Sequence, residues 1–325
     1  MFARKQLKRL YYLLLHAIRH EQNLISGLRG RKRLLVLNLH QVNPHRNPAY
    51  PPLPPEDLDE LIQFLKQSCY FAQLGAENDN AHGDRIPVIL SFDDGLHDFL
   101  EYAAPVLHRH RVTANQNVIT DCVDSGQAPW NIKLYDFLAQ APLSLLREVR
   151  VPGFTRRLES TDPEAVLQYG LALSRHLKNR PLAERAPLLE PLQAVMDRAD
   201  VRYTRMMNRD EVRSLATVHQ IGAHSSSHES MGHETDAFFE QDFARCRGWF
   251  HEVLGRPLSI YAFPNGSYRA SHIRFLRTEG VRNILVVDEK VAQWGTDVKP
   301  RLTLSGESLE ETRFQALGYR ERRAA

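Results

Sequence analysis

Two adjacent aspartates stand directly behind an apolar segment of the chain. Asp93 and Asp94 follow Val88–Leu90 within the sequence Ser-Phe-Asp-Asp-Gly, and residues 86–92 are predicted to form a buried strand. Two ionised carboxylates side by side repel each other, and burial adds a desolvation cost. Such a pair is therefore stable mainly where a cation or a proton compensates it. A metal ion is the natural cation, so these carboxylates are candidate metal ligands.

A second set of candidate ligands lies further along the chain. His224 and His228 are four residues apart, and one helical turn would aim both imidazoles at a single point. Another pair with this spacing, His16 and His20, lies in a basic amphipathic segment with no carboxylate motif nearby, and we interpret it as helix surface. Together with one carboxylate, His224 and His228 would form an open three-ligand metal site.

Both groups are predicted to follow strand ends. His224 comes after the short apolar stretch 220–223, and His40 ends the first predicted strand. Further strands are predicted at 34–39, 113–119, 258–263 and 283–287. Helical segments lie between most of these strands, an alternation typical of a parallel sheet in an α/β protein. Because functional groups collect at the carboxyl ends of such strands, the sequence predicts a (β/α) barrel, or a strand-poor variant of one, with its site at that end.

The alternation of strands and helices is interrupted by one long stretch. Residues from about 130 to 207 contain leucine-rich helical segments and no predicted strand. The stretch is too long for an irregular loop in a compact domain, so we expect a helical insertion. The sequence thus predicts an N-terminal helix over residues 1–33 and a barrel domain over residues 34–325 that carries the insertion at about 130–207.

The composition is that of an ordinary globular protein. The 325 residues are 42% hydrophobic and 25% charged, and this balance does not indicate disorder. Cys69, Cys122 and Cys246 are odd in number and lack metal-type spacing, which favours a reducing compartment. The apolar run Leu10–Leu15 is far shorter than the roughly 20 residues of a spanning helix, and no small-residue cleavage site follows it. We therefore expect a cytoplasmic protein without a spanning helix or a secretory signal.

The N-terminal segment differs in charge from the rest of the chain. Residues 1–33 hold nine lysines and arginines against the single acid Glu21, so the remainder is acidic. Apolar residues recur in this segment at steps of three and four, as in an amphipathic helix. Two interpretations stay open: the helix lies on an anionic surface, such as the bacterial inner membrane, or its apolar stripe packs on the barrel. We expect no nucleic-acid partner, because the acidic bulk of the chain carries no binding motif.

Three motifs in this order resemble those of a known family. Ser91–Gly95 (SFDDG), His224–His228 (HSSSH) and Phe263–Gly266 (FPNG) are similar to the first three motifs of the polysaccharide deacetylases, the carbohydrate esterase family with the NodB homology domain. The resemblance covers residues 34 to about 290, with the helical insertion as a subgroup feature. It implies a distorted (β/α) barrel and a hydrolase that removes N- or O-acetyl groups from glycans with a divalent metal, often zinc.

The resemblance also implies a role for each motif residue. Asp93 would be the general base, and Asp94, His224 and His228 would bind the metal, most simply Zn²⁺. A metal held by three protein ligands keeps a position for water, lowers the pKa of that water and polarises the carbonyl under attack. The backbone N–H of Asn265 would face the developing oxyanion.

The sequence departs from the family pattern at two points. Many members carry an arginine two residues before the proline of the third motif, where this chain has Ala262. Many also have a late histidine that acts as general acid, whereas the last histidine here is His272. We expect His40 to supply the acid. The alternative is that His40 is an ordinary residue at a strand end.

Three functions fit these residues. The first is a metal-dependent deacetylase in the synthesis of a bacterial surface or exported polysaccharide, with a glycan or a lipid-linked sugar as substrate. The second is a non-catalytic carbohydrate-binding relative, which the two departures favour. The third is a hydrolase of another non-peptide C–N bond, such as a formamide, because metal-assisted hydrolysis does not dictate the acyl group. The intact carboxylate and histidine pairs favour catalysis, so we expect an enzyme.

Overall fold

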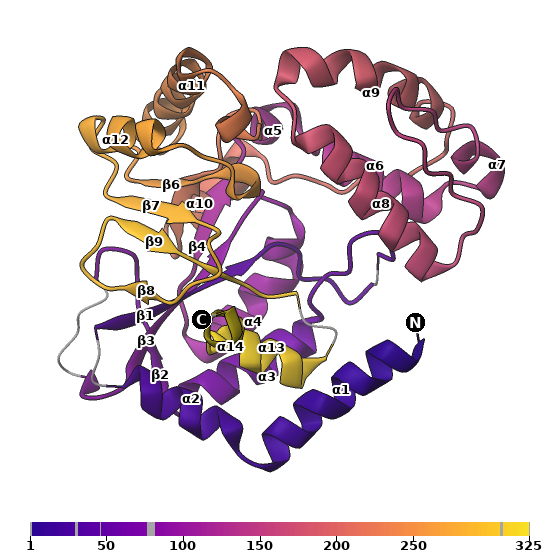
Figure 1. The fold of residues 1–325 in the computed structure, drawn as a ribbon. Helices are drawn as coiled ribbons and strands as arrows, with labels where there is room; N and C mark the ends of the chain where they lie inside the picture. The colour runs from indigo at the N-terminus through magenta and orange to yellow at the C-terminus, as the bar shows by residue number, and fades with distance from the viewer. Residues whose placement is uncertain (1, 30–31, 46, 77–81, 306–307, 325) are drawn as a thin grey trace.

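Parallel strands form a nearly closed barrel with helices around it (Figure 1). The computed structural model describes residues 2–29, 32–45, 47–76, 82–305 and 308–324. The strands are β1 (Arg33–Leu39), β2 (Cys69–Phe71), β3 (Ile86–Phe92), β4 (Asn115–Val118), β5 (Gln220–Ala223), β6 (Ile260–Ala262), β7 (Asn283–Val286), β8 (Ala292–Gln293), β9 (Val298–Pro300) and β10 (Leu302–Thr303). Eight of these strands follow the order β10-β1-β3-β4-β5-β6-β7-β9, and each neighbouring pair is parallel. Off this path, β2 pairs with β3 in parallel and β8 pairs with β1 in the antiparallel direction.

Helices cover the outside of the barrel and build the insertion. Those before the insertion are α1 (Phe2–Ala17), α2 (His20–Leu28), α3 (Pro55–Lys66), the π-helix η2 (Phe99–Ala103), α4 (Ala104–His110) and α5 (Thr120–Ser125). The insertion holds α6 (Trp130–Gln140), α7 (Leu143–Leu146), α8 (Pro163–Lys178) and α9 (Leu182–Met196). The last group is α10 (Arg209–Leu215), η3 (Met231–His233), α11 (Asp236–Leu254), η4 (Pro264–Gly266), α12 (Ala270–Thr278), α13 (Leu309–Ala316) and α14 (Tyr319–Ala324).

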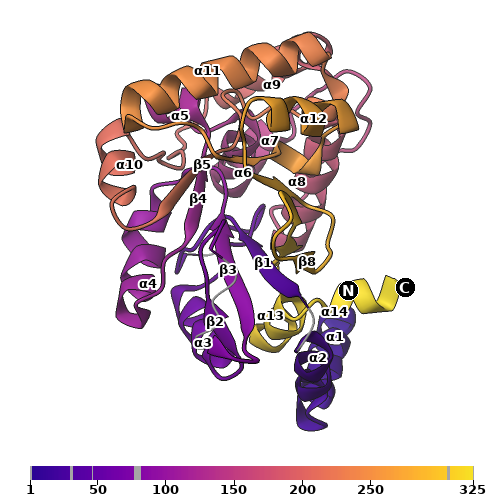
Figure 2. The same cartoon turned by 90° about the vertical axis from the view of Figure 1, so that its left-hand side faces the viewer.

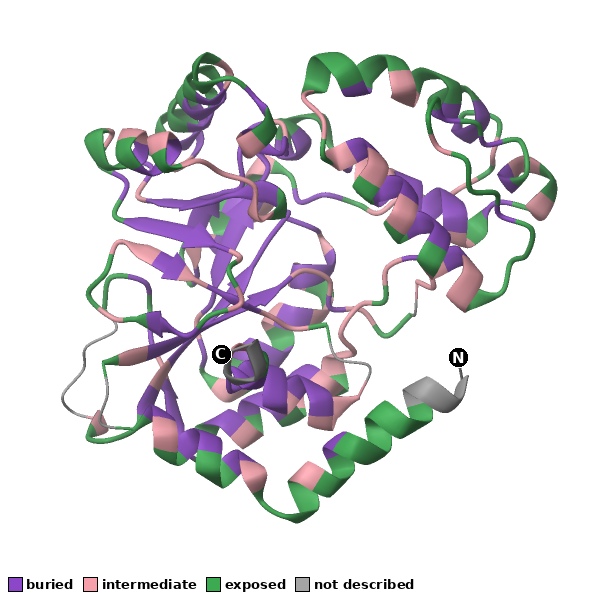
Figure 3. Cartoon of the chain, in the orientation of Figure 1, coloured by how far each residue is buried: buried purple, intermediate pink, exposed green. Residues whose placement is uncertain are grey.

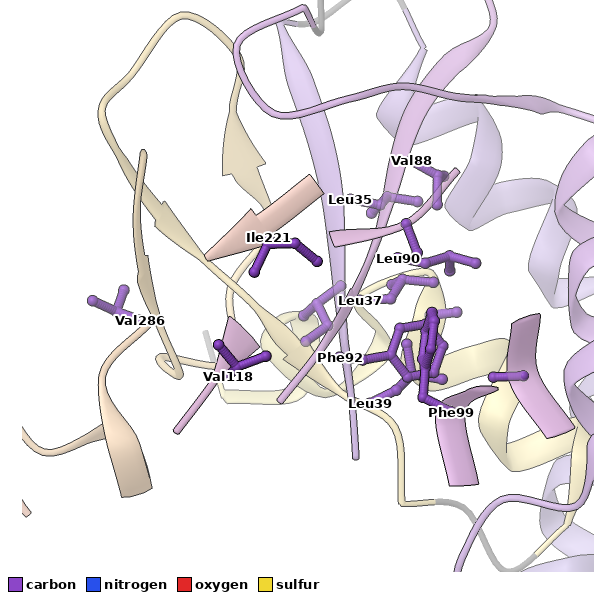
Figure 4. Packing of buried hydrophobic residues seen from close by; sticks show 14 of the residues in the cluster. Leu35, Leu37, Leu39, Val88, Leu90, Phe92, Phe99, Val118, Ile221 and Val286 are labelled. Carbon is purple, nitrogen blue, oxygen red and sulfur yellow. The ribbon is translucent and has the colours of Figure 1, made fainter. Parts of the chain in front are cut away.

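Alternate residues of the barrel strands belong to two different apolar clusters. The main cluster contains Leu35, Leu37 and Leu39 of β1 beside Val88, Leu90 and Phe92 of β3 (Figure 4). The residues between them, including Leu34, Val36 and Ile89, join a second cluster with Ile260 and Leu285. Successive side chains of a strand point to opposite faces, so the second cluster fills the barrel interior while the first packs against the helices. Strands buried on both faces explain the continuous apolar runs in the sequence.

The barrel closes at a seam near the C-terminus. β9 pairs with β7 and β10 pairs with β1, yet β9 and β10 are consecutive and only Arg301 separates them. Residues 298–303 lie beyond the part of the chain that the family resemblance covers, and they complete the sheet within the predicted barrel domain of residues 34–325. Strands of two or three residues are too short to show a period in the sequence.

The insertion is a helical lobe beside the barrel (Figures 1 and 2). Its helices enclose an apolar cluster of their own, which includes Leu134, Phe137, Leu173 and Leu192. The side chain of Asp162 caps the start of α8 by accepting hydrogen bonds from two backbone N–H groups of its first turn. The separate core supports the proposed division of the chain into a barrel and an inserted lobe.

The N-terminal segment consists of two helices rather than the single helix expected over residues 1–33. Arg19 has a left-handed backbone conformation (φ 55°) between α1 and α2, which breaks the helix there. The ring of Tyr12 packs on Phe314 of α13, with 5.6 Å between ring centroids. Much of α1, in contrast, is exposed (Figure 3). Leu7 and Ile18 are 72% and 70% exposed. Residues 1, 30 and 31 of the segment lie outside the described residues.

No helix in the described ranges has the length and apolar character needed to cross a membrane.

Candidate metal centre and active site

Strand β3 delivers the two aspartates to the carboxyl end of the barrel. Asp93 follows the last residue of the strand, and Asp94 has a left-handed backbone conformation (φ 75°). Gly95 continues the turn with φ 78°, and a Cβ atom there would lie 3.2 Å from Val118 of β4. A residue with a side chain would be strained in this conformation and crowded against β4. The turn gives the neighbouring carboxylates different partners.

The two predicted histidine ligands lie in a loop. Residues 224–228 are not the helical turn that their spacing suggested, and His228 has a positive φ of 60°. The buried carboxylate of Asp242 in α11 holds the loop in place. It accepts hydrogen bonds from the backbone N–H and the hydroxyl of both Ser226 and Ser227, at 2.7–3.2 Å. A four-residue spacing cannot distinguish a helix from such a loop, because the residue that shapes the loop lies elsewhere in the sequence.

Asp94, His224 and His228 meet at one buried point. Asp94 Oδ1 lies 3.6 Å from His224 Nε2 and 3.3 Å from His228 Nε2, and the ligand atoms of all three residues lie within 4.8 Å of one another. The Nδ1 atom of His224 is 3.0 Å from the carbonyl oxygen of Ala262. A proton donated from Nδ1 to that carbonyl leaves the Nε2 lone pair free to bind a metal.

The charge state of these three residues suits a metal ion. Burial lowers the pKa of His224 to about 4, so the ring is neutral near pH 7 and its lone pair is available. Burial alone would raise the pKa of Asp94, but the nearby His228 holds that pKa below its usual range. In the part of the chain that the structure describes, the buried Asp94 Oδ1 has no hydrogen-bond partner. Two nitrogen donors and one carboxylate oxygen fit a divalent metal with an open position.

Asp93 belongs to a buried ion pair instead. Arg301 donates from Nη1 to Asp93 Oδ1 and from Nη2 to Oδ2, both at 2.8 Å, and the two side chains are almost fully buried. Asn117 of β4 donates a further hydrogen bond of 2.8 Å to Oδ1. Burial alone would raise the pKa of Asp93, but the Arg301 guanidinium and His224 hold it well below its usual range. The carboxylate is therefore ionised and fixed in orientation.

Arg301 is the functional residue that the sequence did not reveal. It occupies the barrel seam, between β9 and β10, in a region beyond the recognised motifs. Its guanidinium reaches Asp93 although the position of the usual family arginine is taken by Ala262, whose carbonyl instead contacts His224. No motif or apolar run surrounds it in the sequence, where its neighbours include Lys299, Pro300 and Thr303.

His40 and Asn265 complete the set of predicted site residues. His40 follows β1, is half-buried, and lies with its ring centroid 6.1 Å from that of Tyr50. A positive charge on His40 would lower the pKa of both aspartates, as expected for a close neighbour. Asn265 is exposed, has a left-handed backbone conformation (φ 57°) and donates from Nδ2 to Ser230 Oγ at 3.1 Å.

One cavity of about 230 Å³ contains the whole predicted site. Its lining includes His40, Asp93, Asp94, His224, His228 and Asn265. The insertion also contributes to the wall, through Asn131, Ile132, Tyr135, Ser174 and Lys178. A larger hollow of about 1280 Å³ lies against α1, α3 and α4, but none of the six predicted residues lines it. The smaller cavity is therefore the candidate active site.

The fold and the site together define a class of protein. Three candidate metal ligands and an ion-paired carboxylate lie at the carboxyl ends of parallel barrel strands, an arrangement that suits a hydrolase that activates water. Residues 192–284 match the model of a family described as polysaccharide deacetylase. The match spans the second and third motifs and supports the resemblance to the polysaccharide deacetylases. The first motif, Ser91–Gly95, lies outside the match.

Solved structures share this fold. The Streptococcus pyogenes deacetylase PplD, in complex with acetate, is 14% identical, with a TM-score of 0.58 over 88% of this chain and 98% of that chain. IcaB from Ammonifex degensii is 16% identical, with a TM-score of 0.54 over 88% and 97%. BC0361, a polysaccharide deacetylase from Bacillus cereus, is 10% identical, with a TM-score of 0.55 over 88% and 69%. At these identities the likeness shows the fold, and it confirms the predicted barrel. No curated protein matches the sequence.

Proposed function

We propose that this protein is a metal-dependent hydrolase that removes acetyl groups from an N-acetylated sugar in a glycan or a glycan precursor. The observation that carries the proposal is the different pairing of two neighbouring carboxylates. Arg301 binds Asp93, whereas Asp94 lies with the two histidines of the candidate metal centre. One carboxylate can therefore act as a base while the other acts as a ligand.

In this proposal Asp94, His224 and His228 hold one divalent metal ion, and their nitrogen and oxygen donors suit Zn²⁺. The metal supplies Lewis acidity at the acyl carbonyl and a position for the attacking water. The carbonyl of Ala262 keeps the His224 ring in the orientation that ligation needs, and Asp242 fixes the loop that carries both imidazoles.

Asp93 accepts the proton of the attacking water in this proposal. Its two contacts with Arg301 and the amide of Asn117 keep the carboxylate ionised and aimed in one direction. The backbone N–H of Asn265, in the same cavity, donates to the oxyanion that forms as the carbonyl becomes tetrahedral.

The nitrogen that leaves the sugar amide needs a proton as the C–N bond breaks. His40 lines the cavity close to both aspartates and is our candidate donor of that proton, through a ring N–H. It would take the place of the late histidine that many family members use and this chain lacks.

The structure bears differently on the other two functions that fitted the sequence. A non-catalytic binding function rested on a missing arginine and a missing histidine, and Arg301 and His40 now occupy the site. Hydrolysis of a formamide stays a second candidate, because metal-assisted hydrolysis does not dictate the acyl group.

We further propose that the substrate belongs to the synthesis of a bacterial surface or exported polysaccharide and is met at the cytoplasmic face of the inner membrane. Three buried free thiols, of Cys69, Cys122 and Cys246, support a reducing compartment. The exposed leucines of α1 and the basic residues of the segment support contact with an anionic lipid surface. A lipid-linked sugar would suit such a place.

Acetate release is the experiment that tests the proposed activity. Purified protein loaded with Zn²⁺ is expected to release acetate from N-acetylated oligosaccharides, and a chelator should stop the release until metal is restored. Release that persists after complete metal removal would contradict the metal dependence. Comparing N-formyl with N-acetyl forms of the same sugar decides between the two acyl groups.

Vesicle sedimentation tests the membrane contact. Wild-type protein should sediment with vesicles rich in anionic lipid but not with neutral vesicles, and high salt should weaken the binding. Replacement of Leu7 and Ile18 by serine should reduce it, whereas Val218→Ser, at another exposed apolar residue, should not. Equal sedimentation of all three proteins would show that α1 does not bind the membrane.

A further inference from the structure

The inserted lobe supplies part of the wall of the active-site cavity, although none of its residues has a role in the proposed chemistry. The contributing side chains come from α6 and α8. Contacts with the chain just after the histidine loop, residues 224–228, hold the insertion in place. Arg185 of α9 forms a buried ion pair of 2.6 Å with Glu229, the residue after His228. In addition, the backbone N–H of Leu182 donates to Glu234 at 2.5 Å. Groups on this wall therefore face a defined part of any bound substrate.

Lys178, the last residue of α8, is the charged group of this wall. Its side chain is half-buried, and burial lowers its pKa. In the described ranges no carboxylate or other acceptor binds its ammonium group. Withdrawing a cation from water without a partner is unfavourable. A bound ligand with an anionic group would supply the missing partner of the Lys178 ammonium group, and this would explain why the side chain is half-buried.

Neutral polar groups around the cavity also lack partners. Asn131 Oδ1 on the insertion and, on the barrel side, Asn38 Oδ1 and Thr303 Oγ1 are buried without a hydrogen bond to any described residue. Such atoms are normally satisfied, so they indicate hydrogen bonds that a ligand or water completes. Beside them, the rings of Tyr50 and Tyr135 stack at 5.3 Å with an angle of 12° between their planes. Hydroxyl partners next to aromatic rings suit a sugar, which has both polar groups and apolar C–H faces.

The charge balance of the cavity favours an anionic sugar. Arg301 neutralises Asp93, and a divalent metal would more than compensate Asp94, so the ammonium group of Lys178 adds to a positive excess. We propose that the cavity binds one acylated sugar residue that carries a phosphate or carboxylate group, and that Lys178 binds this oxyanion. The inference rests on the proposed function for the place of the acyl group, and it adds the chemical class of the substrate.

Substrate selectivity tests the role of Lys178. N-acetylglucosamine 1-phosphate, the uronic acid form of the same sugar and its neutral methyl glycoside differ in the oxyanion that Lys178 would bind. Wild-type protein should favour one of the anionic sugars over the neutral sugar in kcat/KM. Lys178→Met should reduce that preference about tenfold or more, because a charged hydrogen bond is lost. Lys178→Arg should restore it, and the preferred anion separates phosphate from carboxylate.

Arg175→Met is the matched control, since it removes a charge from the same last turn of α8 at an exposed residue that does not line the cavity. If Lys178 merely stabilises the end of the helix, both variants should lower the melting temperature slightly and leave the preference for anionic sugars intact. That result would overturn the inference. Lys178→Gln, which retains most of the side-chain length, replaces Lys178→Met if the latter fails to fold.

Direct binding separates failure of the inference from failure of the proposed function. If the wild-type protein releases no acetate from any of these sugars, the proposed activity fails. Calorimetry with zinc-loaded protein and the phosphorylated or uronic sugar then still tests Lys178. Binding that is about tenfold or more weaker in Lys178→Met than in wild type supports the inference, whereas equal binding or no binding by both proteins overturns it.

Discussion

The two walls of the active-site cavity differ in how their charged groups are held. On the barrel wall, Asp93 is fixed by Arg301 and Asn117, and His224 is oriented by the carbonyl of Ala262. On the insertion wall, the ammonium group of Lys178 has no partner among the described residues.

The difference separates the residues of the proposed chemistry from a residue that is proposed to recognise the substrate. Groups that move protons or hold a metal must keep one geometry before the substrate arrives, so the protein itself satisfies them. A group that recognises the substrate finds its ionic or hydrogen-bonding partner only when the substrate binds. The same barrel can thus keep its chemistry while an inserted lobe changes what it recognises.

Loss of a metal ligand should have the largest effect on the barrel wall. His228→Ala should leave the protein without its metal and reduce acetate release on the order of 10³-fold or more, since the metal contributes several kcal/mol to the barrier. Elemental analysis of the purified variant measures the metal. His233→Ala, at an exposed histidine outside the cavity, should retain it. Full metal occupancy in His228→Ala would remove this residue from the ligand set.

Loss of Arg301 should be costly for the fold as well as for activity. Arg301→Met leaves the buried carboxylate of Asp93 without its cation and should lower the free energy of unfolding by about 3–5 kcal/mol. The double variant with Asp93→Asn removes both charges and should recover part of that loss, as measured by urea denaturation. A single variant as stable as wild type would mean that the ion pair does not organise this wall.

The proton donor can be separated from the other site residues by its substrate dependence. His40→Ala should reduce N-deacetylation by roughly 10²-fold, because an amine leaving group needs a proton. It should spare an activated acetate ester and leave the metal content unchanged. His45→Ala, at an exposed histidine of the following loop, is the control. Equal losses on amide and ester would make His40 a binding or structural residue, and no loss on either would make it an ordinary strand-end residue.

A pH-dependent effect is expected at Asp98, a buried carboxyl that has no ion-pair partner among the described residues. Burial raises its pKa to about 8. The folded protein then keeps this proton up to about pH 8, while the unfolded chain releases it near pH 4, so the group weakens folding as pH rises through that interval. Asp98→Asn should therefore be more stable than wild type at pH 8, with a gain that shrinks toward pH 4. A gain independent of pH would contradict this account.

The sequence predicted the parts of the molecule that local patterns determine. Strand β3 has the bounds expected from its apolar run, and the segments that lead to Asp94 and His224 are strands as expected. Both predictions rest on a period that neighbouring residues display without help from the rest of the chain. The helical insertion was also recognisable, from its length and its lack of strands.

The parts that the sequence did not predict depend on distant contacts. Asp242 shapes the loop of His228 from another helix, and Arg301 reaches Asp93 across the barrel seam. The break at Arg19 changes one expected helix into two, in a segment whose amphipathic period continues past the break. For the loop of His228 and for Asp93 the deciding partner is far away in sequence, so no local pattern could indicate it.

The different roles of Asp93 and Asp94 form the central claim, and a pair of matched variants tests it most directly. Asp93→Asn and Asp94→Asn make the same chemical change at neighbouring residues, and metal content and acetate release are measured on both proteins. Asp93→Asn should retain about one equivalent of metal and lose on the order of 10²-fold or more in turnover, whereas Asp94→Asn should lose the metal itself. Metal loss in Asp93→Asn together with full occupancy in Asp94→Asn would reverse the assignment, and undiminished turnover in Asp93→Asn would show that Asp93 is not the base.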